Sequence, residues 1–166
     1  MEFVKATIED KALLKNLYSF YLHDLSAFSY SLKPNADGSF EFDSFDLIWE
    51  KEGLTPYLFK LENEIVGFCL LLEAPFTKKV DFCINDFFIY NHFRGNGLAV
   101  EAVKMIFKEK QGSYYVSQLV SNKRAVAFWK KIYEQFQIAY EETLEIEDGE
   151  EVVYQTFHMK SSIKAV

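Results

Sequence analysis

The sequence is poor in proline, glycine and cysteine and has no long apolar run, and each shortage excludes a class of protein. With 3 Pro and 7 Gly among 166 residues, the chain has neither a low-complexity nor a disordered composition. Its apolar runs are a handful of residues long, whereas a transmembrane helix needs about 20. The opening residues Met1-Glu2-Phe3 lack the basic and apolar regions of a signal peptide. These absences indicate a cytoplasmic protein.

Cysteine and positive charge are also scarce. Cys69 and Cys83 are the two cysteines, and each lies in an apolar, strand-like run, which favours buried free thiols over a disulfide or a metal site. The net charge is -7, from 25 acidic and 18 basic residues. Because a negative surface repels phosphate backbones, nucleic acid is not expected as a partner. A cationic ligand such as an amine suits this charge better.

Apolar and aromatic residues are abundant. Hydrophobic residues make up 49% of the chain and aromatic residues 17%, enough for a large core and a pocket. The length is close to that of one ordinary domain, which can bury a core without disulfides. Since no linker or internal repeat divides the sequence, we expect a single domain covering residues 1–166.

The apolar periodicity predicts a mixed α/β (α+β) fold around a central, partly antiparallel sheet. Helical spacing of leucines and aromatics alternates with short apolar runs, and Asp148-Gly149 is a strong hairpin signal. The expected strands are 2–6, 57–60, 65–72, 80–90, 114–120, 137–146 and 151–158, and the expected helices are 8–28, 42–52, 98–112 and 122–133.

One stretch joins the strand at 80–90 directly to the helix that begins at Leu98. The connection contains Gly95 and Gly97, so the main chain can approach a ligand closely. The first N–H groups of a helix lack partners, and the helix dipole adds partial positive charge there. Arg94 adds a cation beside them. The pattern predicts a site for phosphate or pyrophosphate.

Two well-known phosphate loops do not fit this stretch. A P-loop requires Lys and then Ser or Thr after its last glycine, but Gly97 is followed by Leu98 and Ala99. A dinucleotide-binding fingerprint requires a third glycine, and Val100 occupies its place. The predicted anion site is therefore of another kind.

The stretch resembles the GNAT superfamily of acyl-CoA-dependent N-acetyltransferases. Their signature after the fourth strand is Arg/Gln-x-x-Gly-x-Gly/Ala, which Arg94, Gly97 and Ala99 match. The phrase Asp86-Phe87-Phe88-Ile89 is similar to the end of that strand in diamine acetyltransferases. The resemblance implies an acetyl-CoA-dependent enzyme.

A second family motif lies on the helix at 122–133. It reads Asn-x-x-Ala-x-x-aromatic/aliphatic-Tyr, and Asn122, Ala125 and Phe128 match it. The element order also resembles the family along nearly the whole chain. The resemblance implies a GNAT-like fold, with a twisted, mostly antiparallel sheet of six to seven strands flanked by about four helices.

The resemblance also assigns acetyl-CoA, as co-substrate, to particular residues. No metal is expected, because His23 and His158 do not have metal-ligand spacing. Main-chain groups near the end of the motif strand would hold the pantetheine arm, and the turn and helix start would hold the pyrophosphate. Asn122 would lie near the pantetheine or the adenosine. The residues assigned to acetyl-CoA are Phe87, Phe88, Ile89, Arg94, Gly95, Asn96, Gly97, Leu98, Ala99, Val100 and Asn122.

The sequence departs from the family pattern at Trp129, where many relatives have the tyrosine that protonates the leaving thiolate. An indole N–H can donate a hydrogen bond but is not a usable acid. Tyr133, one turn further along the helix, is a candidate substitute, although a packed core aromatic explains it as well. Because a thiol has a pKa of about 8.5, its thiolate leaves readily and strong acid catalysis is not essential.

Asp86 is the candidate general base that removes a proton from an ammonium acceptor, directly or through water. Strand alternation puts Asp86 and Phe88 on one face and Asn85 and Phe87 on the other. The sequence does not say which face meets the acceptor, and a structural carboxylate at a bulge is an equal alternative for Asp86.

The expected reaction is direct acetyl transfer to a primary amine of a small cationic molecule in a ternary complex. An acidic and aromatic segment could form the acceptor wall, or it could be an exposed loop. The segment comprises Tyr30, Phe40, Glu41, Phe42, Asp43 and Asp46.

Two other functions remain open: a non-catalytic acyl-CoA sensor, favoured by Trp129, and acetylation of a protein amino group. A homodimer is also left open. No membrane partner is expected.

Overall fold

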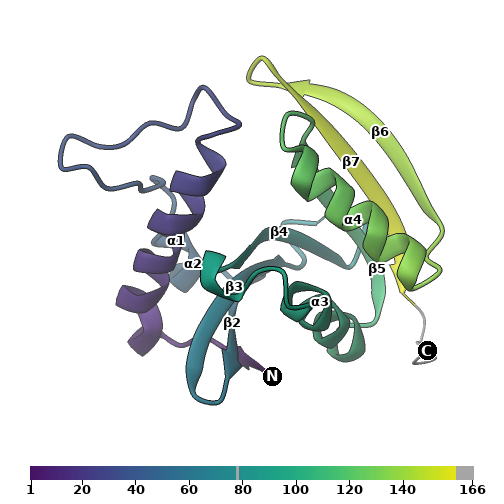
Figure 1. The fold of residues 1–166 in the computed structure, drawn as a ribbon, viewed down its shortest axis with the longest axis horizontal. Helices are drawn as coiled ribbons and strands as arrows, with labels where there is room; N and C mark the ends of the chain where they lie inside the picture. Colours follow the sequence, from purple (N-terminus) through teal and green to yellow (C-terminus); the bar gives the residue numbers. More distant parts are fainter. Residues whose placement is uncertain (78, 160–166) are drawn as a thin grey trace.

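The computed structural model describes residues 1–77 and 79–159, and in that part of the chain one seven-stranded sheet is flanked by four α-helices (Figure 1). The strand order is β1-β2-β3-β4-β5-β7-β6, and every neighbouring pair is antiparallel except β4–β5. The mixed, mostly antiparallel sheet predicted from the sequence is confirmed. The elements are β1 (Glu2–Lys5), α1 (Lys11–Leu25), α2 (Leu47–Glu50), β2 (Leu54–Leu61), β3 (Glu64–Leu72), β4 (Phe82–Ile89), α3 (Leu98–Glu109), β5 (Gly112–Leu119), α4 (Lys123–Gln135), β6 (Tyr140–Glu147) and β7 (Glu150–Met159).

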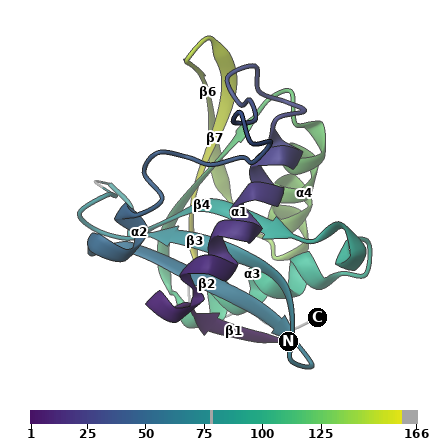
Figure 2. The ribbon, with the colours of Figure 1, turned by 90° about the vertical axis from the view of Figure 1, so that its left-hand side faces the viewer.

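The helices cover the two faces of the sheet in pairs. On one face, α1 runs across β2, β3 and β4 (Figure 2), and its apolar stripe of Leu14 and Leu17 packs in a core with Phe68 and Phe88. On the other face, α3 and α4 cover a larger core that contains Phe107 and several residues of β2 to β5. The sheet is thus buried on both sides at its centre.

The parallel strands β4 and β5 lie side by side for only part of their length. They pair from Phe82 to Ile84 opposite Tyr114 to Val116. Beyond that point β4 continues to Ile89 and β5 to Leu119, and the two strands separate. This separation opens the sheet at its centre.

β4 carries a β-bulge where the two strands begin to separate. In the pairing with β3, Leu71 lies opposite Ile84 and Leu70 opposite Asp86, so Asn85 is the extra residue. The bulge turns the following residues relative to the first half of β4. It therefore decides which side chains of the second half face α1 and which face α4.

Most predicted elements exist, with shifted ends. The first helix is shorter than expected, because residues Ile8–Asp10 form a 3-10 turn, and the helix expected at 42–52 is a single turn, α2. Cys69 and Cys83 are buried free thiols, as predicted. In the described residues no helix has the length and apolarity that a membrane span requires.

Candidate active site

A cavity of about 260 Å³ lies at the opening between β4 and β5. Residues of α1, β4, β5, α4 and the β6–β7 hairpin contribute to its wall. It is lined by Tyr21, Leu25, Ile84, Asn85, Phe87, Val116, Ser117, Gln118, Leu119, Asn122, Ala125, Trp129, Glu147 and Val152. A separate groove of about 320 Å³ lies between α4 and the hairpin and contains none of the predicted site residues.

The free edge of β4 presents main-chain groups to this opening. Tyr90 N donates to Val66 O across the β3–β4 pairing, so Tyr90 and, two residues back, Phe88 direct their N–H and C=O groups toward β3. Phe87 and Ile89 must then direct theirs to the opposite side, where β5 has moved away. The N–H and C=O of Phe87, which lines the cavity, and the N–H of Ile89 are therefore directed to the side predicted for the pantetheine arm.

Arg94 fixes the turn that follows β4. Its Nε donates to Ile89 O at 2.7 Å, its Nη2 lies 2.7 Å from Asp24 Oδ2 on α1, and the guanidinium stands over the Phe88 ring at 5.4 Å. The cation is held firmly, but Asp24 compensates its charge. The turn must therefore attract an anion chiefly through main-chain N–H groups.

The turn ends at Gly97, which is the N-cap of α3 and has φ +80°. Gly95 is also left-handed, at φ +86°, and a Cβ added to either glycine would meet nothing within 4 Å. With no capping side chain at Gly97, the first N–H groups of α3 stay free for an external acceptor. The predicted pyrophosphate residues thus form a positive, accessible helix start next to Leu98.

Asp86 lies on the α1 face of the sheet, together with Phe88. Its Oδ2 accepts hydrogen bonds from Tyr18 Oη at 2.8 Å and from Asn85 Nδ2 at 2.9 Å, and the Tyr21 hydroxyl interacts with the same carboxylate. Burial raises the pKa of Asp86, and these three donors oppose the rise. The carboxyl therefore releases its proton at a higher pH than an exposed aspartate does.

Asp86 does not itself line the cavity, but its neighbours Tyr21 and Asn85 do. Burial, with the nearby carboxylate, raises the pKa of Tyr21 well above its usual range, so the phenol stays neutral. A neutral hydroxyl can accept one proton and donate another. Sequence reasoning missed Tyr21, because its helical spacing placed it among the core aromatics of α1.

Trp129 and Tyr133 both lie on α4, but only Trp129 reaches the cavity. Trp129 lines the cavity and packs edge-on against Phe87, with ring centroids 6.1 Å apart. Tyr133 is 1% exposed, is not among the lining residues, and donates its hydroxyl to Gln155 Oε1 at 2.9 Å. Burial also raises the pKa of Tyr133. The geometry brings Trp129 to the opening and leaves Tyr133 behind it in the core, so it gives no support to an acid role for Tyr133.

Asn122 begins α4 at the cavity wall. Its Oδ1 accepts from Ala125 N at 3.1 Å, which makes Asn122 the N-cap of the helix. The amide nitrogen on the same side chain is a donor that this cap does not use. Asn122 therefore caps α4 with its Oδ1, and its Nδ2 can still donate a hydrogen bond to a ligand in the opening.

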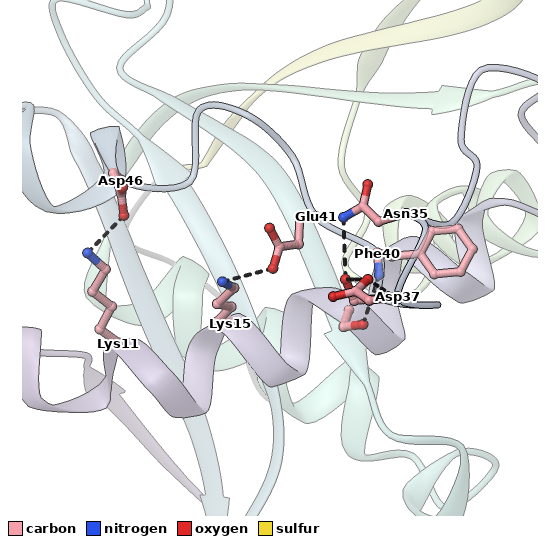
Figure 3. A network of polar contacts seen from close by, with 9 residues as sticks. Lys11, Lys15, Asn35, Asp37, Phe40, Glu41 and Asp46 are labelled. Carbon is pink, nitrogen blue, oxygen red and sulfur yellow. Dashed lines mark hydrogen bonds and ion pairs between the residues drawn. The ribbon is translucent and has the colours of Figure 1, made fainter.

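The acidic and aromatic segment before α2 lies along the outer side of α1 (Figure 3). Glu41 pairs with Lys15 at 2.8 Å, and Asp46 pairs with Lys11 at 2.8 Å. Phe42 packs against Tyr18 in the α1 core. None of the six residues expected to form an acceptor wall lines the cavity. The structure favours the alternative, an exposed acidic loop with an aromatic anchor.

The model of the acetyltransferase (GNAT) family matches residues 15–133. No curated protein matches the sequence. In the described residues, no group of three or more His, Cys, Asp or Glu side chains could hold a metal ion.

Solved acetyltransferase structures have the same fold at low sequence identity. An N-acetyltransferase from Staphylococcus aureus Mu50 is 12% identical with a TM-score of 0.67, covering 94% of this chain and all of that one. A diaminobutyrate acetyltransferase from Paenibacillus lautus, in complex with L-2,4-diaminobutyric acid and coenzyme A, is 14% identical with a TM-score of 0.65, covering 95% and 94%. A chimeric spermidine N-acetyltransferase from Vibrio cholerae is 13% identical with a TM-score of 0.63, covering 96% and 97%.

The family match spans well over half of the chain and includes β4, the Gly97 turn, α3 and most of α4. It agrees with the sequence motifs and with a fold whose central strands separate beside a free helix start. The chain belongs to the GNAT family of acyl-CoA-dependent N-acetyltransferases.

Proposed function

We propose that this protein transfers an acetyl group from acetyl-CoA to a primary amine of a small cationic molecule, with Asp86 as the general base. The observation that carries the proposal is the position of Asp86 directly behind the cavity wall, in contact with Tyr21 and Asn85, which line it. A carboxylate at this place lies beside the opening in which the two substrates would meet.

The α4 side of the opening fits acyl-CoA. The helix start at Gly97 offers free N–H groups for the pyrophosphate, and Phe87 and Ile89 offer main-chain groups for the pantetheine arm. The Ile89 N–H is directed away from β3, toward the side that β5 has left, where it would polarise the thioester carbonyl by a hydrogen bond. Acyl-CoA supplies the activated acyl group, and the protein supplies its alignment.

The α1 side of the opening fits a cationic amine. Glu147 lines the cavity, and Asp86 lies behind Tyr21. Two carboxylates near an aromatic wall attract an ammonium group by charge and by cation–π contact. Among the proteins of similar fold, one is named for spermidine and another is bound to L-2,4-diaminobutyric acid, both of which are amines. We place the acceptor on this side.

The proposed chemistry needs two proton movements. The acceptor ammonium gives its first proton to the Tyr21 hydroxyl, which passes its own proton to Asp86. The freed nitrogen bonds to the acyl carbon as the carbon–sulfur bond breaks, and the second proton leaves with the sulfur as thiol. Trp129 can donate a hydrogen bond to that sulfur. Alignment of the two substrates supplies much of the rate.

The experiment is thiol release from acetyl-CoA across a panel of acceptors, with CoA binding measured by calorimetry. We expect release with aliphatic primary amines that carry a second positive charge, and slower release with neutral amines of the same length. Peptide amino groups are the comparison class. CoA binding without release for any amine or peptide would favour the sensor function. Preferential release with peptides would favour a protein acceptor.

A further inference from the structure

Two glutamines are buried on neighbouring strands at the centre of the molecule, and only one of them has partners. Gln155 on β7 is fully buried, accepts from Tyr133 and donates to Glu142 Oε2 at 2.8 Å. Gln118 on β5 is 6% exposed, and neither its Nε2 nor its Oε1 has a hydrogen-bond partner in residues 1–77 and 79–159. Buried polar groups are nearly always paired, because an unpaired one destabilises the fold. Gln118 therefore calls for a partner outside the protein.

Gln118 also lines the cavity at the opening between β4 and β5. Its burial alternates in phase with Tyr114 and Val116, whose side chains belong to the core under α3 and α4. The unpartnered amide thus stands on the α4 side of the sheet, with Trp129 among the other lining residues. An orphaned, buried side chain that borders a cavity is independent evidence for a ligand group.

The surroundings define the chemistry of that group. All the lining residues on β4, β5 and α4 are uncharged, and the charged lining residue, Glu147, belongs to the hairpin. A charged ligand group would lose its hydration without compensation on the uncharged side. A primary amide offers donors and an acceptor together. The natural complement of Gln118 is a neutral group that carries both C=O and N–H, which is a secondary amide.

The opposite wall of the opening fits the same group. Phe87 directs its main-chain N–H and C=O into the opening. An extended chain with amide groups can therefore pair with β4 on one side and with Gln118 on the other. The pantetheine arm of CoA is such a chain, with two secondary amides between its pyrophosphate and its sulfur.

We propose that Gln118 is a positioning residue, which binds a secondary amide of the pantetheine arm and thereby sets the depth at which the thioester lies beside Trp129. This inference rests on the proposed function, since it needs acyl-CoA with its pyrophosphate at Gly97. Gln118 does not touch the reacting atoms. It fixes the arm so that the acyl carbon reaches the Ile89 N–H.

The test compares ligands with and without the arm in wild type and in Gln118→Leu, which keeps the volume and removes the amide. Calorimetry measures binding of CoA and of adenosine 3′,5′-bisphosphate, which lacks the arm. We expect Gln118→Leu to weaken CoA binding about 10-fold and to leave binding of the bisphosphate unchanged. We also expect a higher melting temperature without ligand, because an unpaired buried amide is removed; a structural role would lower it.

Two further variants complete the test. Gln118→Met replaces the same group with a flexible side chain and is expected to repeat the result if the leucine packs poorly. Gln155→Leu is the matched control, because Gln155 is paired: we expect a lower melting temperature and an unchanged ratio of CoA to bisphosphate affinity.

The outcomes separate this inference from the function on which it rests. Unchanged CoA affinity in both Gln118 variants, in an enzyme that still transfers the acyl group, overturns the inference alone. The same result with a raised KM for amide-bearing acceptors assigns Gln118 to the acceptor and also overturns it. Failure of the wild type to bind CoA overturns both the inference and the proposed function.

Discussion

The two halves of β4 have the same strand geometry but opposite surroundings. At Cys83 and Ile84 the strand has a neighbour on each side, and both residues are buried. From Asn85 to Ile89 one neighbour is gone, and the main chain faces a cavity. The closed half contributes stability, and we propose that the open half contributes the site. The bulge at Asn85 marks the boundary between them.

The open half also differs between its two faces. On the α1 face, Asp86 is surrounded by the hydroxyls of Tyr18 and Tyr21, which suits proton transfer. On the α4 face, Phe87 and Trp129 form an apolar wall, which suits an uncharged arm and a thioester. One strand can thus separate base chemistry from acyl-CoA binding across a single sheet.

The largest effect is expected at Asp86. Asp86→Asn keeps the shape but removes the base, so acyl transfer is expected to fall about 10²–10⁴-fold in single-turnover thiol release. CoA affinity, measured by calorimetry, is expected to stay the same, because Asp86 lies on the α1 face. A matching loss of CoA affinity would show that the two faces are not separate.

Stability should respond to Asp86→Asn in the opposite direction to activity. Because the pKa of Asp86 is raised in the folded protein, the native state holds this proton more tightly than the unfolded chain. The contribution of Asp86 to the free energy of unfolding therefore falls as pH rises from its pKa in the unfolded chain to its pKa in the folded protein. The variant is expected to melt no lower than wild type at neutral pH in a thermal scan. A clearly lower melting temperature would assign Asp86 a structural role.

The turn after β4 is expected to give the next largest effect. Gly97→Val should weaken CoA binding at least 10-fold, because φ +80° strains a β-branched residue and the helix start must move. Gly38→Val is the control. Gly38 has φ +84°, and a Cβ added to it would also meet nothing within 4 Å, but Gly38 lies in the acidic loop, far from Gly97 in the sequence. Equal CoA affinity in the two variants would contradict an anion site at Gly97.

Tyr133 and Trp129 are expected to show smaller effects that differ in kind. Tyr133→Phe removes the hydrogen bond to Gln155, so we expect a loss of about 1 kcal/mol in unfolding free energy and little change in acyl transfer. A loss of about 10²-fold or more in the transfer rate of Tyr133→Phe would instead establish Tyr133 as the acid.

Trp129→Phe is expected to raise the activation barrier of acyl transfer by about 0.5–1.5 kcal/mol, the value of one hydrogen bond, as measured by single-turnover thiol release.

The sequence predicted those features that depend on neighbouring residues. The strand–turn–helix at Gly97, the Asp148-Gly149 hairpin and the element order depend on local spacing, and they are confirmed. The alternation of Asp86 with Phe88 also holds, because both residues follow the bulge.

The features that could not be predicted depend on distant contacts. Asp24, which pairs with Arg94, is 70 residues away in the chain. The helical spacing of Tyr21 is that of a core aromatic, and its contact with Asp86 depends on the packing of α1 against β4. Gln118 lies in an ordinary strand pattern, and whether its side chain has hydrogen-bond partners depends on the packing of the core around it. The acidic loop was ambiguous because the lysines of α1 that pair with it lie in another element.

The pH dependence of single-turnover acyl transfer tests the central claim most directly, namely that the open half of β4 supplies the base. The ionisable groups that interact with Asp86 are Tyr18, Tyr21, Cys69 and Cys83. Burial raises the pKa of each, so all four stay neutral near neutral pH. The wild-type rate should therefore rise with pH through an inflection above the usual carboxyl range, and Asp86→Asn should lack it. The same inflection in Asp86→Asn would contradict the account.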